Sequence, residues 1–331
     1  MPTLLVSHSV HARYGADIAA HATRLGHPLE LIVLPADPAA RLPEETCARV
    51  ELAFFSSDVF PDHSRQFFST VRKAPRLQWL HVFNAGVDHP IYTEMMERGA
   101  RLTTSSGSTA EPIAQTAIAG LLILARNFPH WLASQQRHAW NPVRAPDSVP
   151  RDLSTQRMLI LGLGKIGNEI ARLARALGMQ VTAVRRTPRR ADDHADAIEP
   201  PERLDALLPA ADWLTIACPL TAETRGLIDA ARLARLPRGA RVVNIARGEI
   251  VDEPALIAAL RSGHLAGAYL DVYAQEPLPA DSPLWDLPNV VLTPHNSSVA
   301  TGNERRVYDI FRENLARWLR GEALVNEMPR A

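Results

Sequence analysis

The sequence has little of what marks secreted, membrane-spanning or nucleic-acid-binding proteins. Two cysteines, Cys47 and Cys218, among 331 residues are too few for a disulfide framework and favour a reducing compartment. Lysine plus arginine equals aspartate plus glutamate at 36 each, so no overall charge attracts nucleic acid or an anionic membrane. The longest apolar run, residues 117–125, is too short to span a bilayer. The first residues lack the basic segment and apolar run of a secretory signal. We therefore expect a cytoplasmic protein without nucleic-acid or membrane partners.

Two series of short apolar segments alternate with helical patterns along the chain. The first series has candidate strands at residues 3–6, 30–33, 52–55, 79–82 and 101–103. The second has candidate strands at residues 158–161, 181–184, 213–216, 242–244, 268–271 and 290–292. Strands that alternate with helices form parallel sheets covered by helices on both faces. The sequence therefore predicts an α/β protein with two doubly wound parallel-sheet domains.

Two longer helices are predicted to connect these domains. Residues 108–111 and 301–304 both have the pattern of a capping box, in which a hydroxyl and a glutamate satisfy free backbone N–H groups. Apolar residues then recur three and four positions apart, which buries one face of each helix. Gly321 is expected to end the second helix.

The segment 159–167, Leu-Ile-Leu-Gly-Leu-Gly-Lys-Ile-Gly, predicts a dinucleotide-binding loop between a strand and a helix. Gly162 would make the tight turn, Gly164 would let the backbone approach a pyrophosphate, and Gly167 would allow the helix to pack closely on the strand. The helix start would offer free N–H groups and a positive dipole end to the phosphates. An ordinary glycine-rich turn is the alternative.

The end of the next candidate strand bears on the choice of dinucleotide. NAD sites usually have an acidic residue there, which accepts hydrogen bonds from the ribose hydroxyls. Here Arg185, Arg186 and Thr187 follow, and guanidinium groups bind phosphate with paired, charge-assisted hydrogen bonds. Asp192 and Asp193 lie too far along the loop for the acidic role. The sequence therefore favours NADP, with NAD still possible, and a solvated basic loop is the alternative.

Three residues near the ends of candidate strands suggest chemistry: Arg247, Glu276 and His295. In open α/β sheets the carboxyl ends of the strands meet the ligand, so these side chains could converge beside a nicotinamide. Taken singly, an arginine after a strand is usually a surface ion pair, and a histidine is more often structural than catalytic. Together with the glycine loop, they favour a catalytic group. No metal site is predicted.

These segments resemble the D-2-hydroxyacid dehydrogenase family, and in particular its glyoxylate/hydroxypyruvate reductase-like members. The similarity covers nearly the whole chain. Besides the glycine loop, it rests on the following segments: Asn84-Ala85-Gly86-Val87-Asp88, Cys218-Pro219-Leu220-Thr221-Ala222-Glu223-Thr224, Asn244-Ile245-Ala246-Arg247-Gly248, Leu270-Asp271-Val272, Glu276-Pro277 and Thr293-Pro294-His295.

The resemblance implies a flavodoxin-like substrate-binding domain at residues 1–103 plus 299–331. It implies a Rossmann NAD(P)-binding domain at residues 104–298, with a cleft between the two. It also implies a homodimer formed through the long helix that begins near Glu111. Because the sequence ends at Ala331, we expect a member without the extra C-terminal regulatory domain, which weakens a phosphoglycerate dehydrogenase interpretation.

The resemblance also implies roles for individual residues. Arg247 would hold the carboxylate and carbonyl oxygen of the substrate, and His295 would donate a proton to that oxygen as hydride arrives. Glu276 would pair with His295 and stabilise its imidazolium form. The backbone N–H groups of Ala85 and Gly86 would bind the substrate carboxylate. Asp271 would receive the nicotinamide carboxamide. Further cofactor contacts are implied at Lys165, Ile166, Cys218, Pro219, Thr224, Ile245, Ala246 and His295.

The function implied is reduction of small 2-oxo acids, such as glyoxylate or hydroxypyruvate, to D-2-hydroxy acids with NADPH. One alternative is an NAD-linked D-2-hydroxyacid dehydrogenase that acts on a larger side chain. Another is a dinucleotide-sensing scaffold, like the corepressors that share this fold. A scaffold would not need the three catalytic residues, which this chain has.

Overall fold

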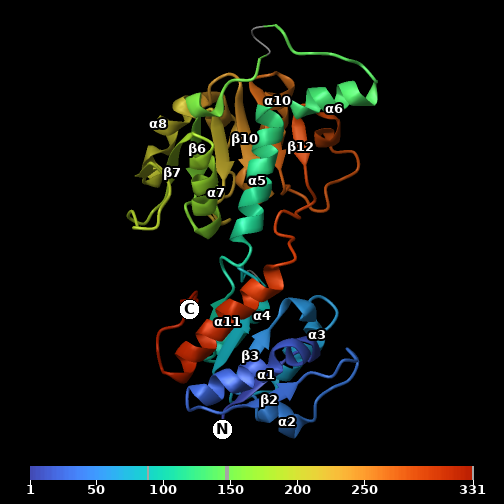
Figure 1. Ribbon diagram of the computed structural model, residues 1–331, viewed down its shortest axis with the longest axis vertical. Helices are drawn as coiled ribbons and strands as arrows, with labels where there is room; N and C mark the ends of the chain where they lie inside the picture. Colours follow the sequence, from blue (N-terminus) through green and yellow to red (C-terminus); the bar gives the residue numbers. More distant parts are fainter. Residues whose placement is uncertain (88, 146–148, 330–331) are drawn as a thin grey trace. The chain divides into compact units, whose positions relative to one another are not determined.

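The computed structural model describes residues 1–87, 89–145 and 149–329, and Figure 1 shows its ribbon. The chain divides into two compact units. Unit 1 comprises Met1–Ser108 and Ala300–Ala331, and unit 2 comprises Thr109–Val299. The first boundary lies five residues beyond the predicted one and the second lies one residue beyond it. Each unit is built on a sheet of parallel strands, which confirms the predicted α/β class.

Unit 1 has a five-stranded sheet in the order β2-β1-β3-β4-β5, with every pairing parallel. The order changes direction between β1 and β3, as in flavodoxin-like sheets. Its strands are β1 (Thr3–Val6), β2 (Glu30–Val33), β3 (Leu52–Phe55), β4 (Trp79–Val82) and β5 (Arg101–Thr104). Its helices are α1 (His8–Arg24), α2 (Glu44–Ala48), α3 (Ser64–Arg72), α4 (Pro90–Glu97) and α11 (Asn303–Leu319). Four strands have the predicted bounds, and β5 is one residue longer.

Both faces of the unit 1 sheet are buried because successive strand residues point to opposite sides. Phe54 packs with Phe311 and Leu315 of α11 on one face. Phe55 packs with Phe67 of α3 on the other face. The last long helix of the chain therefore belongs to the core of the first unit.

Unit 2 has a seven-stranded sheet in the order β12-β11-β10-β9-β6-β7-β8. Its strands are β6 (Arg157–Leu161), β7 (Gln180–Val184), β8 (Ala197–Glu199), β9 (Trp213–Ile216), β10 (Ala240–Asn244), β11 (Leu265–Leu270) and β12 (Val290–Leu292). Its helices are α5 (Ala110–Ala125), α6 (Phe128–Gln136), α7 (Lys165–Ala176), α8 (Leu204–Leu207), α9 (Ala230–Arg235) and α10 (Glu253–Arg261). The apolar faces of α5 and α7 cover one side of the sheet, and those of α9 and α10 cover the other.

Strands β6, β7, β10 and β11 begin one to three residues before their predicted starts, and two further strand predictions for unit 2 needed correction. The sequence did not predict β8, because Ala-Ile-Glu is a short, half-buried edge strand without a long apolar run. Asp271 was predicted inside a strand, but β11 ends at Leu270 and Asp271 is the residue after it. The second difference matters chemically, because it places the carboxylate at the edge of the sheet.

The predicted capping boxes do not form. Helix α5 begins after Thr109, whose side chain makes no capping hydrogen bond, and α11 begins after Gly302, which has no side chain to cap with. The carbonyl of Ser108 instead accepts a hydrogen bond from Arg306 Nε at 2.6 Å. Gly321 does follow the end of α11 in the left-handed region, with φ 71°, as predicted.

Helix α5 lies against β11 through a glycine. A Cβ atom on Gly120 would lie 2.3 Å from Cγ of Tyr269, so the aromatic ring occupies the space that a side chain would need. Glycine is therefore required here for close packing and not for flexibility. Among the described residues, no helix combines the length and the apolar character needed to cross a membrane.

Candidate active site

The predicted cofactor and catalytic residues of unit 2 all follow the carboxyl ends of strands in one parallel sheet. The glycine loop follows β6, Arg185 follows β7 and Cys218 follows β9. Arg247 follows β10, Asp271 and Glu276 follow β11, and His295 follows β12. Because β10, β11 and β12 are neighbours, the three predicted catalytic residues lie on adjacent connections at the same edge.

The three glycines of the loop have separate structural reasons. Gly162 has φ 92°, and a Cβ there would lie 2.6 Å from the Cα of Cys218. A Cβ on Gly167 would lie 2.0 Å from the carbonyl oxygen of Gly162, so a side chain would push the helix away from the turn. Space is open around the Cβ position of Gly164, where no atom of the described chain lies within 4 Å.

This arrangement fits a dinucleotide pyrophosphate. Gly164 is the N-cap residue of the twelve-residue helix α7 and contributes no side-chain cap. The first N–H groups of a helix have no partner within the helix, and they attract anions together with the helix dipole. Lys165 is exposed in the first turn, and Ile166 packs partly against the core. When bound, the nicotinamide group would supply the hydride for reduction.

The connection after β9 is held by its own hydroxyl groups. Thr224 Oγ1 donates to the carbonyl of Pro219 at 2.7 Å and accepts from the N–H of Thr221 at 2.7 Å. Burial raises the pKa of the Cys218 thiol to about 11. The Cys218 thiol is therefore uncharged at neutral pH, and the residue packs against the glycine turn and does not act as a nucleophile.

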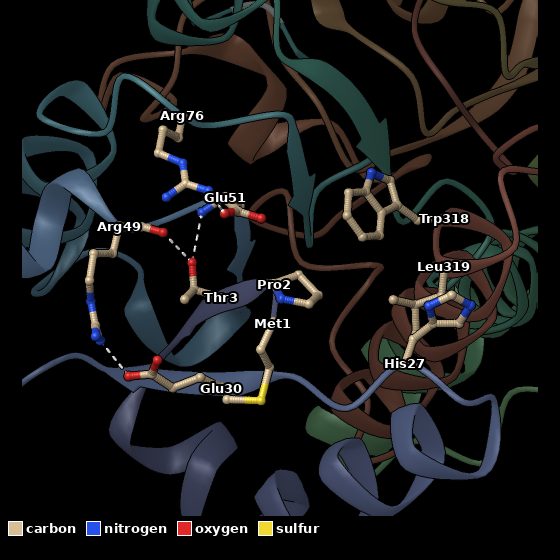
Figure 2. Close-up of a pocket in the computed structure, with 10 residues that line it drawn as sticks. All are labelled: Met1, Pro2, Thr3, His27, Glu30, Arg49, Glu51, Arg76, Trp318 and Leu319. Atoms are coloured by element: carbon tan, nitrogen blue, oxygen red, sulfur yellow. Dashed lines mark hydrogen bonds and ion pairs between the residues drawn. The ribbon is translucent and has the colours of Figure 1, made fainter.

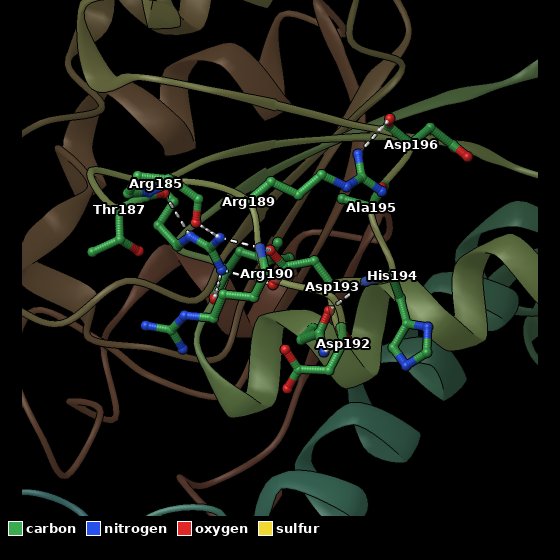
Figure 3. Close-up of polar contacts among 12 residues, drawn as sticks. Arg185, Thr187, Arg189, Arg190, Asp192, Asp193, His194, Ala195 and Asp196 are labelled. Atoms are coloured by element: carbon green, nitrogen blue, oxygen red, sulfur yellow. Dashed lines mark hydrogen bonds and ion pairs between the residues drawn. The ribbon is translucent and has the colours of Figure 1, made fainter.

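The structure gives the Arg185 side chain partners within its own loop (Figure 3). Its guanidinium binds both carboxylate oxygens of Asp193, with Nη1–Oδ1 at 2.7 Å and Nη2–Oδ2 at 2.6 Å. The remaining donors bind the carbonyls of Leu163, Thr187 and Pro188. An arginine side chain has five N–H donors, and all five are used here. Arg185 therefore has no donor left for a phosphate. Asp193, which the sequence analysis placed too far along the loop for the acidic role, folds back to Arg185.

The next two residues remain candidates for phosphate binding. Arg186 and Thr187 are exposed. Within the described part of the chain, the guanidinium of Arg186 makes no hydrogen bond or ion pair. Glu223 lies in its vicinity, and the pKa of that carboxyl is lowered mainly by the hydrogen bond from Thr221 and to a smaller extent by the charge of Arg186. A free guanidinium next to a hydroxyl is suited to a phosphate group.

The turn that carries Arg247 is fixed by a buried asparagine, which the sequence analysis did not identify. Asn244 Nδ2 donates to the carbonyl of Arg247 at 3.0 Å, and Asn244 Oδ1 accepts from the N–H of Ala246 at 3.1 Å. The asparagine is 2% exposed. Ile245 and Ala246 are buried within this turn. Asn244 closes the turn like a backbone group, as asparagine often does at strand ends.

Gly248 brings the Arg247 turn against the segment that carries Glu276. A Cβ on Gly248 would lie 1.8 Å from the carbonyl carbon of Tyr273. No side chain fits in that space, because the backbone of the neighbouring connection fills it. The two connections are therefore in direct contact at this edge of the sheet.

His295 and Glu276 form the predicted pair. His295 Nδ1 lies 2.7 Å from Glu276 Oε2, and the other carboxylate oxygen accepts the N–H of Tyr273 at 3.0 Å. A carboxylate can only accept, so the hydrogen is on Nδ1 and Nε2 is the ring atom available to a ligand. His295 is in the left-handed region with φ 50°, and its own N–H donates to the carbonyl of Asp271 at 2.8 Å.

Asp271 has a structural task that the sequence analysis missed. Its side chain is buried, and it accepts hydrogen bonds from Thr293 Oγ1 at 2.6 Å, from the N–H of Asn296 at 2.9 Å and from Ser297. These contacts fix the turn on both sides of His295. They span 22 to 26 residues, so no local pattern could reveal them. Contact with the nicotinamide stays a prediction.

A pocket of about 650 Å³ opens beside the His295–Glu276 pair within unit 2. Its other walls are mostly apolar. They are Tyr273, Pro277, Leu278, Trp285, Leu292, Thr293 and Pro294. A pocket of this size could take a ligand larger than a two-carbon acid.

Ala85 and Gly86 lie in unit 1, exposed on the connection after β4. Asn84 Nδ2 donates to the carbonyl of Gly86 at 3.0 Å and to the hydroxyl of Tyr92 at 2.9 Å, which shapes this loop. Asp88, from the same segment, lies outside the described residues. The role of the loop in binding a carboxylate stays a prediction.

A different pocket, of about 590 Å³, lies in unit 1 (Figure 2). It lies at the amino ends of the strands, where Thr3 begins β1 and Glu30 begins β2. Its two arginines are already paired, Arg49 with Glu30 and Arg76 with Glu51. The two arginines and the two glutamates therefore satisfy one another.

Comparisons with known proteins agree with this geometry. Residues 118–297 match the family described as "D-isomer specific 2-hydroxyacid dehydrogenase, NAD binding domain". The chain belongs to the D-isomer specific 2-hydroxyacid dehydrogenase family. It is 34% identical over 261 residues to a glyoxylate reductase of Korarchaeum cryptofilum, covering 77% of each chain. It is 36% identical over 263 residues to glyoxylate/hydroxypyruvate reductase B of Pectobacterium atrosepticum, covering 77% of this chain and 80% of the relative.

A solved structure gives the same family. A D-isomer specific 2-hydroxyacid dehydrogenase from Xanthobacter autotrophicus Py2, crystallised with NADPH and MES, has 31% sequence identity and a TM-score of 0.75. The alignment covers 99% of this chain and 98% of that one. The family resemblance is thus confirmed over both units, and the chain is an NAD(P)-dependent oxidoreductase.

Proposed function

We propose that this dehydrogenase reduces small 2-oxo acids of the glyoxylate and hydroxypyruvate type to D-2-hydroxy acids, with NADPH as the hydride donor. The His295–Glu276 pair carries the proposal, because it leaves one ring nitrogen as a proton donor at the sheet edge where the glycine loop lies. The relatives named as glyoxylate and hydroxypyruvate reductases support the substrate class.

The residues of the chain divide the chemistry between them. Glu276 accepts the Nδ1 hydrogen, which orients the ring. His295 Nε2 gives its proton to the carbonyl oxygen as hydride reaches the keto carbon, and takes it back in the reverse direction. Arg247 binds the carboxylate and keeps the keto carbon in position. Ala85 and Gly86 bind the same carboxylate with backbone N–H groups.

The preference for NADPH is assigned to Arg186 and Thr187. Their exposure and the free guanidinium of Arg186 support this assignment, and so does the NADPH bound to the relative from Xanthobacter autotrophicus Py2. NAD remains a usable cofactor, because the pyrophosphate contacts at Gly164 and α7 are common to both dinucleotides. Cys218, Pro219, Thr224, Ile245 and Ala246 would line the remainder of the dinucleotide site.

A second candidate function is oxidation or reduction of 2-hydroxy and 2-oxo acids with a larger apolar side chain. The pocket of about 650 Å³ beside His295 favours it, because its walls are mostly apolar. We also propose a cytoplasmic homodimer. Large apolar side chains are exposed on and just after α6, among them Phe128, Leu132 and Trp140, and such groups often lie at interfaces.

A substrate panel tests these proposals. Glyoxylate, hydroxypyruvate, pyruvate, 2-oxoisocaproate and phenylpyruvate would each be assayed with NADPH and NADH. The configuration of the product would be determined for every acid except glyoxylate, whose product, glycolate, has no stereocentre. The first proposal expects the highest kcat/KM for glyoxylate and hydroxypyruvate with NADPH, and the D product from hydroxypyruvate. Higher values for the branched or aromatic acids would support the second candidate instead. An L product would contradict both.

A further inference from the structure

We propose that Arg185 and Asp193 form a buried clasp that positions the loop between them for the 2′-phosphate of NADP. In this arrangement both are positioning residues, and neither touches the phosphate. The inference rests on the proposed use of NADPH. It assigns a function to Asp193, a residue that the sequence placed outside the cofactor site.

The clasp is buried although the loop around it is exposed. The side chains of Arg185 and Asp193 are 10% and 3% exposed, whereas Arg186, Thr187 and Arg190 are all exposed. The paired hydrogen bonds from Arg185 lower the pKa of the Asp193 carboxyl, so it is charged at neutral pH. A buried ion pair with all its hydrogen-bonding groups satisfied specifies one geometry, because removal of one partner leaves the other charge buried and unpaired.

The clasp binds three separate stretches of backbone. Arg185 donates to the carbonyl of Leu163, which lies between the first two glycines of the dinucleotide loop. It also donates to the carbonyls of Thr187 and Pro188, at the start of its own loop. Asp193 accepts the N–H of Arg190 at 2.6 Å, near the end of the loop. The loop is thus tied to the pyrophosphate-binding turn.

Helix α7 fastens the far side of the same loop. Asn168 Nδ2 donates to the carbonyl of Asp192 at 2.8 Å, and Asn168 Oδ1 accepts the N–H of His194 at 2.7 Å. Asn168 lies in the first turns of α7, directly after the glycines. The loop, the helix start and the glycine turn are therefore one connected hydrogen-bonded assembly.

This assembly has a consequence for charge. The carboxylate of Asp193 cancels the charge of Arg185, so Arg185 adds little attraction for a phosphate. Arg186 follows immediately, and its guanidinium is free of hydrogen bonds and ion pairs within the described residues. The clasp fixes the backbone of the residue on which the phosphate contact depends, and a preorganised contact loses less entropy on binding.

The substitution Asp193→Asn distinguishes two roles for Asp193: it could position the loop, or it could compete with the phosphate for Arg185. If Arg185 were a phosphate ligand held back by Asp193, the substitution would free it and tighten the binding of NADPH. If the clasp positions the loop, the same change loosens the loop and weakens binding. We expect about a tenfold rise in the Kd for NADPH and for 2′,5′-ADP, typical of one lost charge-assisted contact, and at most a small change for NADH.

Asp192→Asn is the matched control, because it removes the same charge one residue away. The Asp192 side chain is exposed, and only its backbone carbonyl bonds to α7. Binding of the three probes would be measured by calorimetry on the full chain. Hydrogen exchange of residues 186–193 would be read without cofactor. We expect faster exchange in Asp193→Asn and the unchanged rate in Asp192→Asn.

A second variant, Arg185→Lys, keeps the positive charge and removes the forked contacts to the carbonyls. It tests the clasp independently if Asp193→Asn fails to fold. It is expected to weaken NADPH binding and speed exchange in the same direction. Unchanged or tighter NADPH binding in Asp193→Asn, with NADPH preferred by the unaltered protein, would overturn the clasp. No preference for NADPH or 2′,5′-ADP over NADH or 5′-AMP in the unaltered protein would instead overturn the proposed cofactor, and with it this inference.

Discussion

Acidification from pH 8 to pH 5 is expected to weaken unit 1 through one buried histidine, His81 on β4. Its ring is fully buried and lies between two hydroxyl groups, with Nδ1 2.7 Å from Thr103 Oγ1 and Nε2 3.0 Å from Ser105 Oγ. Trp79 Nε1 donates to the same Thr103 oxygen at 2.8 Å, and Ser105 Oγ donates to the carbonyl of Val82 at 3.1 Å.

One arrangement of the hydrogens satisfies all of these contacts. An indole N–H can only donate, so Thr103 Oγ1 accepts from Trp79, and in this arrangement its own hydrogen goes to His81 Nδ1. Ser105 gives its hydrogen to a carbonyl, so it accepts from His81 Nε2. The neutral ring with hydrogen on Nε2 satisfies every group. In this arrangement a second ring hydrogen, on Nδ1, would point at the hydroxyl hydrogen of Thr103. Burial also disfavours the positive charge of a protonated ring.

The magnitude follows from the pKa. Burial lowers the pKa of His81 from 6.5 to about 3 in the folded protein. Because the folded value is the lower one, protons favour the unfolded chain. The stabilisation is complete above pH 6.5 and is lost as the pH falls toward the folded pKa. At pH 5 the unfolded histidine is almost fully protonated and the folded one is not, which removes about 2 kcal/mol from the free energy of unfolding.

His81→Gln isolates this contribution, since an amide can donate and accept in the same place without titrating. Urea unfolding would be followed by hydrogen exchange of β4 and β5, so that the signal comes from unit 1, at pH 8 and at pH 5. The unfolding free energy of the unaltered protein should fall by about 2 kcal/mol more than that of the variant. Parallel falls in the two proteins would refute the argument, as would an NMR spectrum of the folded protein showing a protonated His81 ring at pH 5.

Three further outcomes are expected. Glu276→Gln should lower kcat by about 100-fold, the scale of general acid–base catalysis, while calorimetric binding of NADPH stays the same; an unchanged kcat would contradict the pairing with His295. Gly120→Ala, normally stabilising in a helix, should destabilise unit 2 by roughly 1–3 kcal/mol in urea unfolding, because Tyr269 fills the space; a gain in stability would contradict this. Alkylation of Cys218 at pH 8 should be about 100-fold slower than that of an ordinary thiol, since its pKa is raised to about 11, and fast labelling of the folded protein would show that the thiol is not buried.

Much of the site was accessible from the sequence because its signals are local. The glycines after β6 and the apolar strands are patterns over a few residues, and local sterics decide them. Arg247, Glu276 and His295 were predicted to lie together because each follows a strand, and the carboxyl ends of parallel strands share one edge. The pairing of His295 with Glu276 came from the family resemblance, and the structure confirms it.

Contacts between distant residues were decided by the tertiary structure alone. The sequence contained Arg185 and Asp193, but only the folded loop shows that the Asp193 carboxylate pairs with the Arg185 guanidinium. The same holds for Asp271, whose carboxylate fixes the turn around His295. Sequence determines which groups are present and which strand each follows. The fold decides which donors and acceptors pair with one another. Which of these groups remain available to a ligand is therefore known only from the folded structure.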